Sequence, residues 1–131
     1  MKIGFLFPVI GLVIASSAVQ AGGIQGRYEV NPVNDVVYEV VSQGAYGGAA
    51  FWCAAGEYVE TELKISSNPE IYVAREAGPS ETTGGKTAAQ FTLDPAAAGI
   101  TPIDKDTGNL NDPLVGEHIS AKRARLFCTT G

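Results

Sequence analysis

The chain contains two cysteines, Cys53 and Cys128, and a bond between them would constrain every other element of the fold. Such a bond would close a loop of about 75 residues and restrict the unfolded chain by about 4 kcal/mol on the chain-entropy account. It would also tie the last turn of the chain to its middle. Neither cysteine belongs to a C-x-x-C motif or follows a basic residue, so a structural disulfide is favoured over a reactive thiol.

The first 21 residues have the three-part layout of a secretory signal peptide. Lys2 is followed by an apolar run from Ile3 to Ile14 and then by the small residues that lead to Ala21. We therefore predict cleavage after Ala21 and a periplasmic or secreted protein, and disulfides persist in such compartments.

An uncleaved membrane anchor is the alternative reading of this segment. The run from Ile3 to Val19 is near the lower length limit for spanning a bilayer, and Pro8 interrupts it. No cluster of Lys or Arg follows it as a stop-transfer signal. We expect no stable membrane insertion after cleavage.

The remaining 110 residues suit one small domain. We divide the chain into a signal peptide (1–21), a flexible N-terminal segment (22–34) and a single domain (35–131). Because Lys2 is the only charged residue of the signal peptide, the rest has 8 basic and 14 acidic residues. This net charge of −6 disfavours nucleic acid as a partner.

Residue patterns predict an α+β fold with a small, mostly antiparallel sheet. Apolar residues at helical spacing, Trp52, Ala55, Val59 and Leu63, predict one main helix over about residues 49–64. Gly56 inside this helix suggests close packing against a neighbour. We expect strands at 27–30, 36–41, 71–74, 87–93 and 114–119, the third and fourth as a hairpin. A short C-terminal helix should run over 121–128, with Ser120 as its N-cap and the disulfide joining both helices.

The stretch from Ser80 to Thr87 resembles a phosphate-binding loop of the form G-x-x-x-x-G-K-[ST]. Such a loop needs Gly where Ser80 stands and a helix that begins near Lys86, but the following residues are strand-like. We therefore interpret the stretch as a polar hairpin loop and expect no nucleotide ligand.

The segment from Asp104 to Asp112 is rich in oxygen ligands but departs from an EF-hand at three positions. A solvated acidic turn is the simpler interpretation. Asp104, Asp106 and Asp112 remain weak candidates for a looser calcium site, and we assign no metal site and no cofactor.

His118 is the only histidine and cannot supply the several imidazole ligands of a zinc site. No G-x-S-x-G motif is present to expose a nucleophilic serine. We therefore assign no catalytic residue, and we take His118 with a nearby carboxylate as the weakest candidate for an acid–base pair.

Several segments resemble an uncharacterised group of small exported proteins from alphaproteobacteria. They include Ala50 to Tyr58 (AFWCAAGEY), Tyr72 to Arg75, Gln90 to Leu93 and the ending from Ile119 to Cys128. The resemblance spans most of residues 36–128 and implies an exported domain with one cysteine pair. It implies no activity.

These observations predict a non-catalytic domain that binds a protein or an envelope component, because no catalytic, metal or cofactor motif survives inspection. A small extracytoplasmic hydrolase-like enzyme is one alternative. A calcium-dependent interaction module is another.

Overall fold

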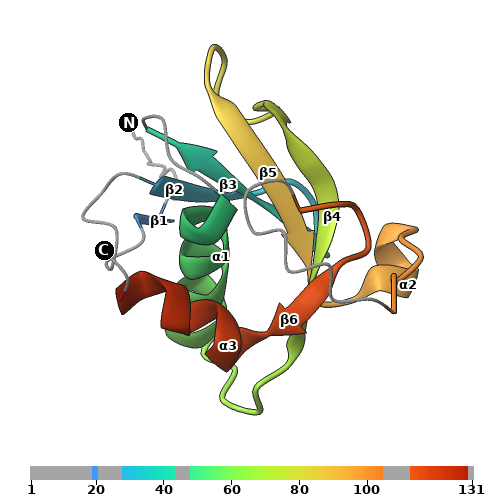
Figure 1. The fold of residues 1–131 in the computed structure, drawn as a ribbon. Helices are drawn as coiled ribbons and strands as arrows, with labels where there is room; N and C mark the ends of the chain where they lie inside the picture. The colour runs from blue at the N-terminus through green and yellow to red at the C-terminus, as the bar shows by residue number, and fades with distance from the viewer. Residues whose placement is uncertain (1–18, 21–27, 44–47, 105–112, 130–131) are drawn as a thin grey trace, which may run out of the picture.

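The computed structural model describes residues 19–20, 28–43, 48–104 and 113–129, and a six-stranded antiparallel sheet dominates them (Figure 1). The strands lie in the order β1-β2-β3-β5-β4-β6. Their bounds are β1 Val19–Gln20, β2 Tyr28–Pro32, β3 Val37–Ser42, β4 Glu70–Pro79, β5 Thr87–Thr92 and β6 His118–Ser120. β4 and β5 form the expected hairpin.

One main helix covers one face of this sheet (Figure 1). It comprises α1 (Gly48–Glu57) and a π-helical turn, η2 (Tyr58–Glu62). The short C-terminal helix α3 (Ala121–Leu126) packs against α1 and continues as the 3₁₀ turn η3 (Phe127–Thr129). Another short helix, α2 (Pro95–Ala98), follows β5. The predicted α+β class is confirmed.

The hydrophobic core lies between α1 and the sheet. Along β3, Tyr38 and Val40 belong to this core, whereas the alternating Glu39 and Val41 are buried on the opposite face. Trp52 of α1 packs against Phe91 of β5 with ring centroids 5.2 Å apart. The core comprises Tyr28, Val30, Tyr38, Val40, Phe51, Trp52, Ala54, Ala55, Val59, Ile71, Val73, Ala89, Phe91, Ile119, Ala121 and Ala124.

The predicted disulfide between Cys53 and Cys128 is confirmed. Its sulfurs lie 2.05 Å apart and the two Cα atoms 4.9 Å apart. The bond joins the middle of α1 to η3, so the C-terminal helix is covalently attached to the main helix.

Ser120 caps α3 as predicted, because its side-chain oxygen accepts a hydrogen bond from the amide of Arg123 at 3.2 Å. Gly56 also lies where the sequence suggested close packing. A Cβ added there would be 2.8 Å from the Cβ of Ala124 and 3.0 Å from the carbonyl oxygen of Ala121. Helices α1 and α3 therefore approach each other at Gly56.

Several element boundaries differ from the sequence predictions. The α-helical part of the main helix ends at Glu57, and Leu63 is 41% exposed instead of buried with Trp52. The π-helical turn is the reason, because its wider turn changes the direction of the side chains that follow. Strand β4 extends to Pro79, well beyond the predicted 71–74.

The predicted strand at 114–119 is confined to β6, which begins at His118. Gly116, at φ +95°, lies in a turn before it, and a positive φ is incompatible with a regular strand. At the N-terminal side, β2 pairs with β3 along its whole length. The sheet therefore includes residues 28–32 of the segment 22–34 that we expected to precede the domain.

Most of the predicted signal peptide, including Ala21, lies outside the described residues. The two described residues within it form β1, which pairs with Glu29 and Val30 of β2. Cleavage after Ala21 would remove β1 and make β2 an edge strand of the sheet. In the described part of the chain, no helix has the length and hydrophobicity that crossing a membrane requires.

Replacing both cysteines, Cys53→Ala with Cys128→Ala, should lower the free energy of unfolding by about 4 kcal/mol, because the loop-closure entropy returns to the unfolded chain. Urea denaturation measures this loss. Wild-type protein treated with a dithiol reductant should show a loss of similar size. A loss below about 1 kcal/mol in both cases would contradict the structural role of the bond.

Gly56→Ala should destabilise the fold by about 1–3 kcal/mol, because the added methyl group overlaps Ala124. This loss is the net effect, after the gain of about 1 kcal/mol that alanine brings in helix propensity. Gly84→Ala is the matched control, because a Cβ at Gly84 has no heavy atom within 4 Å. A Gly56→Ala variant as stable as the control in thermal unfolding would show that the helices can separate without cost.

Candidate functional site

A groove with a volume of about 350 Å³ opens between the β2–β3 turn, η2 and the end of β5. Its volume is at the lower end of the range for ligand pockets, which suits one or two side chains. The walls are mainly apolar and comprise Val36, Val37, Tyr38, Tyr58, Leu63 and Leu93.

The π-helical turn builds one wall of the groove. The amide of Leu63 donates to the carbonyl of Tyr58 at 3.0 Å, an i→i+5 hydrogen bond. At the preceding carbonyl, that of Glu57, the hydroxyl of Thr61 donates at 2.7 Å and so competes for the acceptor that the α-helical amide of Thr61 would use. Both Tyr58 and Leu63 line the groove. Such π-helical turns are frequent at functional sites.

Two tyrosines whose rings pack at a tilt of 34° form the aromatic part of this wall. The rings of Tyr38 and Tyr58 lie 4.7 Å apart at their centroids, and the buried Tyr38 hydroxyl donates to the carbonyl of Ala55 at 3.3 Å. Burial raises the pKa of Tyr38, and the neighbouring Tyr58 adds to this increase. The pKa of Tyr58 is raised by burial and then by the charge of Glu62. Both phenols are therefore neutral at physiological pH.

Carboxylates occupy the rim of the groove. In the β2–β3 turn, the side-chain oxygen of Asn34 accepts hydrogen bonds from the amides of Val36 and Val37, both at 2.9 Å, and fixes the turn beside Asp35. Directly after β5, Asp94 caps α2 by accepting a hydrogen bond from the amide of Ala97 at 3.1 Å. Asp35 and Asp94 both line the groove, whereas no lysine or arginine is among the described residues that line it.

A second depression, of about 360 Å³, has a mixed lining of Glu60, Lys64, Ile65, Ser66 and Lys122. The Glu60 carboxylate already accepts a hydrogen bond from Arg125 at 2.7 Å. The described lining of this second depression contains no aromatic residue. We therefore take the first groove, which we call the tyrosine groove after Tyr38 and Tyr58, as the candidate functional site.

The loop that resembles a phosphate-binding motif connects β4 and β5, as expected for a hairpin loop. Its polar groups bind an anion that the chain itself provides, the fully buried carboxylate of Glu39. The amides of Glu81 and Thr82 donate to this carboxylate at 2.9 and 3.0 Å, and the hydroxyl of Ser80 donates at 2.7 Å. These donors are therefore already occupied, which agrees with the rejection of a nucleotide site.

Strand neighbours complete the environment of Glu39. Gln90, which lies opposite Glu39 on β5, donates to the carboxylate at 3.0 Å. Arg75 lies opposite Gln90 on β4 and forms an ion pair with Glu39 at 3.3 Å. The register of the pairing between β4 and β5 shifts on both sides of Arg75, as it does at a β-bulge. Such a shift changes the direction in which a side chain points.

The pKa of Glu39 reflects a balance of opposing effects. Burial alone raises it, but the hydrogen bonds from Glu81, Thr82, Gln90 and Ser80 prevail and lower the pKa from 4.5 to about 2. Since the folded-state pKa is below the ordinary value, the carboxylate stabilises the fold fully above about pH 4.5. This contribution disappears as the pH falls toward 2.

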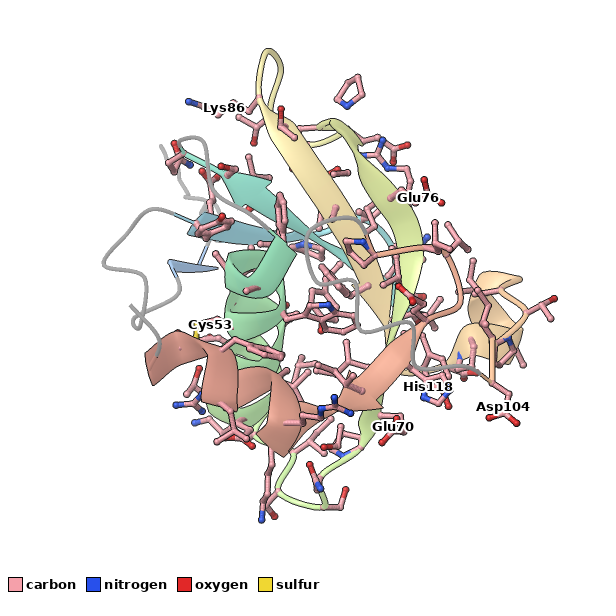
Figure 2. All side chains as sticks on the ribbon, viewed as in Figure 1. Cys53, Glu70, Glu76, Lys86, Asp104 and His118 are labelled. Carbon is pink, nitrogen blue, oxygen red and sulfur yellow. A yellow bond between two sulfur atoms is a disulfide. The ribbon has the colours of Figure 1, made fainter. Side chains whose placement is uncertain are left out.

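The structure places His118 beside a carboxylate. Its Nδ1 lies 2.7 Å from Oε1 of Glu70, and its ring lies 4.7 Å from that of Tyr72 (Figure 2). The two side chains come from the paired strands β6 and β4, away from the groove lining, and both are partly exposed. Within the described residues, His118 has no recorded hydrogen bond to a serine or cysteine.

The other candidates from the sequence are not brought into a site. Asp104 is exposed, while Asp106 and Asp112 lie outside the described residues. Ligand atoms of Cys53, Glu57 and Cys128 lie within 4.8 Å of one another, but the two sulfurs are bonded to each other and are not thiolate ligands.

Sequence reasoning missed both Glu39 and the tyrosine pair. For Glu39 a signal exists, because it is the one charged residue within the apolar run from Val36 to Val41. For Tyr38 and Tyr58 no sequence signal distinguishes a groove wall from core. No family model, curated protein or solved structure matches this chain.

Glu39→Gln should lower the free energy of unfolding at pH 7 by about 3 kcal/mol, because an amide cannot accept all the hydrogen bonds that the carboxylate accepts. Glu76→Gln, on an exposed position of the same hairpin, is the control and should leave stability within about 0.5 kcal/mol. Urea denaturation at pH 7 measures both.

The same variant should lose part of the acid sensitivity. As the pH falls from 5 to 2.5, the free energy of unfolding of the wild type should decrease more steeply than that of Glu39→Gln. The difference between the two slopes should correspond to up to one additional proton taken up on unfolding. Equal pH slopes for the two proteins would show that Glu39 does not hold the lowered pKa.

Proposed function

We propose that this chain is an exported protein, cleaved after Ala21, whose domain binds a protein or envelope component through the tyrosine groove without catalysing a reaction. The observation that carries the proposal is the groove itself, an apolar depression with an aromatic wall built by a π-helical turn. Aromatic side chains in a concave surface are typical anchors of binding sites.

Export to the periplasm or the medium rests on the signal-peptide layout of residues 1–21. The disulfide between α1 and η3 is compatible with an oxidising compartment. The resemblance to small exported alphaproteobacterial proteins favours the same location and remains a prediction.

A hydrolase-like enzyme is the second candidate, and the contact between His118 and Glu70 favours it. A carboxylate on Nδ1 orients an imidazole for general-base chemistry at Nε2. The pair lies away from the groove lining, however, and a nucleophile is needed to complete a site. A calcium-dependent module based on Asp104, Asp106 and Asp112 rests on sequence alone.

A photoreactive amino acid in place of Leu63, which lines the groove and is 41% exposed, should crosslink to the bound component in intact cells. The same substitution at Glu76, on β4, should give no such adduct. Adding Tyr58→Ala to the Leu63 probe should reduce the yield several-fold, because it removes the aromatic wall. Mass spectrometry identifies the adduct and should show that the protein chain begins at Gly22.

Equal adducts from both positions, or none from Leu63, would contradict binding at the groove. Urea denaturation of the Tyr58→Ala variant tests whether a reduced yield reflects unfolding. A chain that retains Met1 would contradict cleavage and leave the groove result unaffected.

A further inference from the structure

We propose that the tyrosine groove binds a lysine or arginine side chain from a segment of a partner protein. This inference rests on the proposed binding function and specifies the chemistry that the groove recognises. It combines three properties of the groove: the charge of its rim, its aromatic wall and its size.

The rim is negative and uncompensated. Within the described residues, no hydrogen bond or ion pair to the carboxylate of Asp35 is recorded, and this residue is exposed at the tip of its turn. Asp94 uses one carboxylate oxygen, Oδ1, to cap α2 and retains the other. Glu62 is close enough to Tyr58 to raise its pKa, so a third negative charge acts near the aromatic wall. A cation entering the groove would therefore be attracted by the carboxylates that line it.

The aromatic wall suits a cation as well. Tyr58 is partly exposed and its neutral ring can accept an ammonium or guanidinium group over its face within about 6 Å. The buried Tyr38 supports this ring through a tilted ring contact, with the centroids 4.7 Å apart. The position of Tyr58 is therefore established before a ligand binds, which reduces the entropy cost of binding.

The apolar walls match the aliphatic stem of the same side chains. Lys and Arg bury their methylene groups along apolar surface while the charged end stays near water or a counter-ion. Val36, Leu63 and Leu93 offer such a surface in the same groove as the carboxylates. A neutral apolar ligand would leave the rim carboxylates without a partner, and an anionic ligand would be repelled by them.

The size of the groove favours a protein over a free small molecule. A volume of about 350 Å³ is at the lower end of the range for ligand pockets and holds one or two side chains, so the rest of a larger ligand would lie outside the groove. The exposed part of Leu63 continues the apolar surface beyond the groove, where neighbouring residues of a partner segment would pack. We therefore assign the cation to a protein segment.

The test uses the mature protein and blocked tripeptides with a central arginine, lysine, glutamine or glutamate between two leucines. Titrations followed by NMR should shift the amides of Val36, Val37 and Leu63 with the arginine and lysine peptides. These peptides should bind at least roughly tenfold more tightly than the glutamine peptide, and added salt should weaken them.

The matched variant combines Asp35→Asn and Asp94→Asn. It removes both rim charges, while asparagine at position 94 preserves the helix cap. It should bind the arginine peptide roughly tenfold more weakly than the wild type. Glu76→Gln removes one carboxylate outside the groove lining and should leave the affinity unchanged.

Each other outcome would overturn the inference. A glutamine or glutamate peptide that binds the groove as tightly as the arginine peptide would leave the binding function intact but contradict cation recognition. Arginine methyl ester or spermidine binding more tightly than the peptides would contradict a protein source. If no peptide shifts the groove amides while the Leu63 probe still crosslinks, the proposed function stands and this inference fails.

Discussion

The buried carboxylate of Glu39 is the contact on which the face of the sheet opposite α1 depends. A charge that is removed from water costs several kcal/mol unless its oxygens are satisfied. The polar groups at the start of the β4–β5 loop satisfy them, and Gln90 and Arg75 complete the set. The loop therefore lies over this face of β3, and this strand is buried on both sides although the main helix covers only one face of the sheet.

The same strand also supports the groove, because side chains alternate along it. Tyr38 precedes Glu39 and faces α1, where its hydroxyl donates to the carbonyl of Ala55 and its ring packs against that of Tyr58. A rigid β3 thus positions an internal anion on one face and a groove wall on the other. We infer that loosening the Glu39 contacts would also loosen the support of Tyr38.

On the helical side of the sheet, the attachment of α3 to α1 stabilises the C-terminal part of the chain. Close approach at Gly56 and the bond between Cys53 and Cys128 fix the C-terminal helix on the main helix. For a domain of about 100 residues, a covalent link of this kind supplements a modest hydrophobic core. Strand β6, which directly precedes α3, adds the pairing with β4 that brings His118 to Glu70.

The sequence by itself determined the features that depend on local pattern: the main helix, the C-terminal helix with its N-cap at Ser120, and the hairpin of β4 and β5. It also predicted the disulfide, because the chain has only two cysteines, but it predicted neither β1 nor α2. The helices, the cap and the hairpin follow from side-chain periodicity and backbone preference within a few residues. Tertiary structure alone decided the partners of Glu39, which are 36 to 51 positions away, and the joining of three separate segments into the tyrosine groove. It also decided that the polar loop from Ser80 binds the internal carboxylate of Glu39. Such contacts depend on how distant surfaces pack, and no local pattern records that.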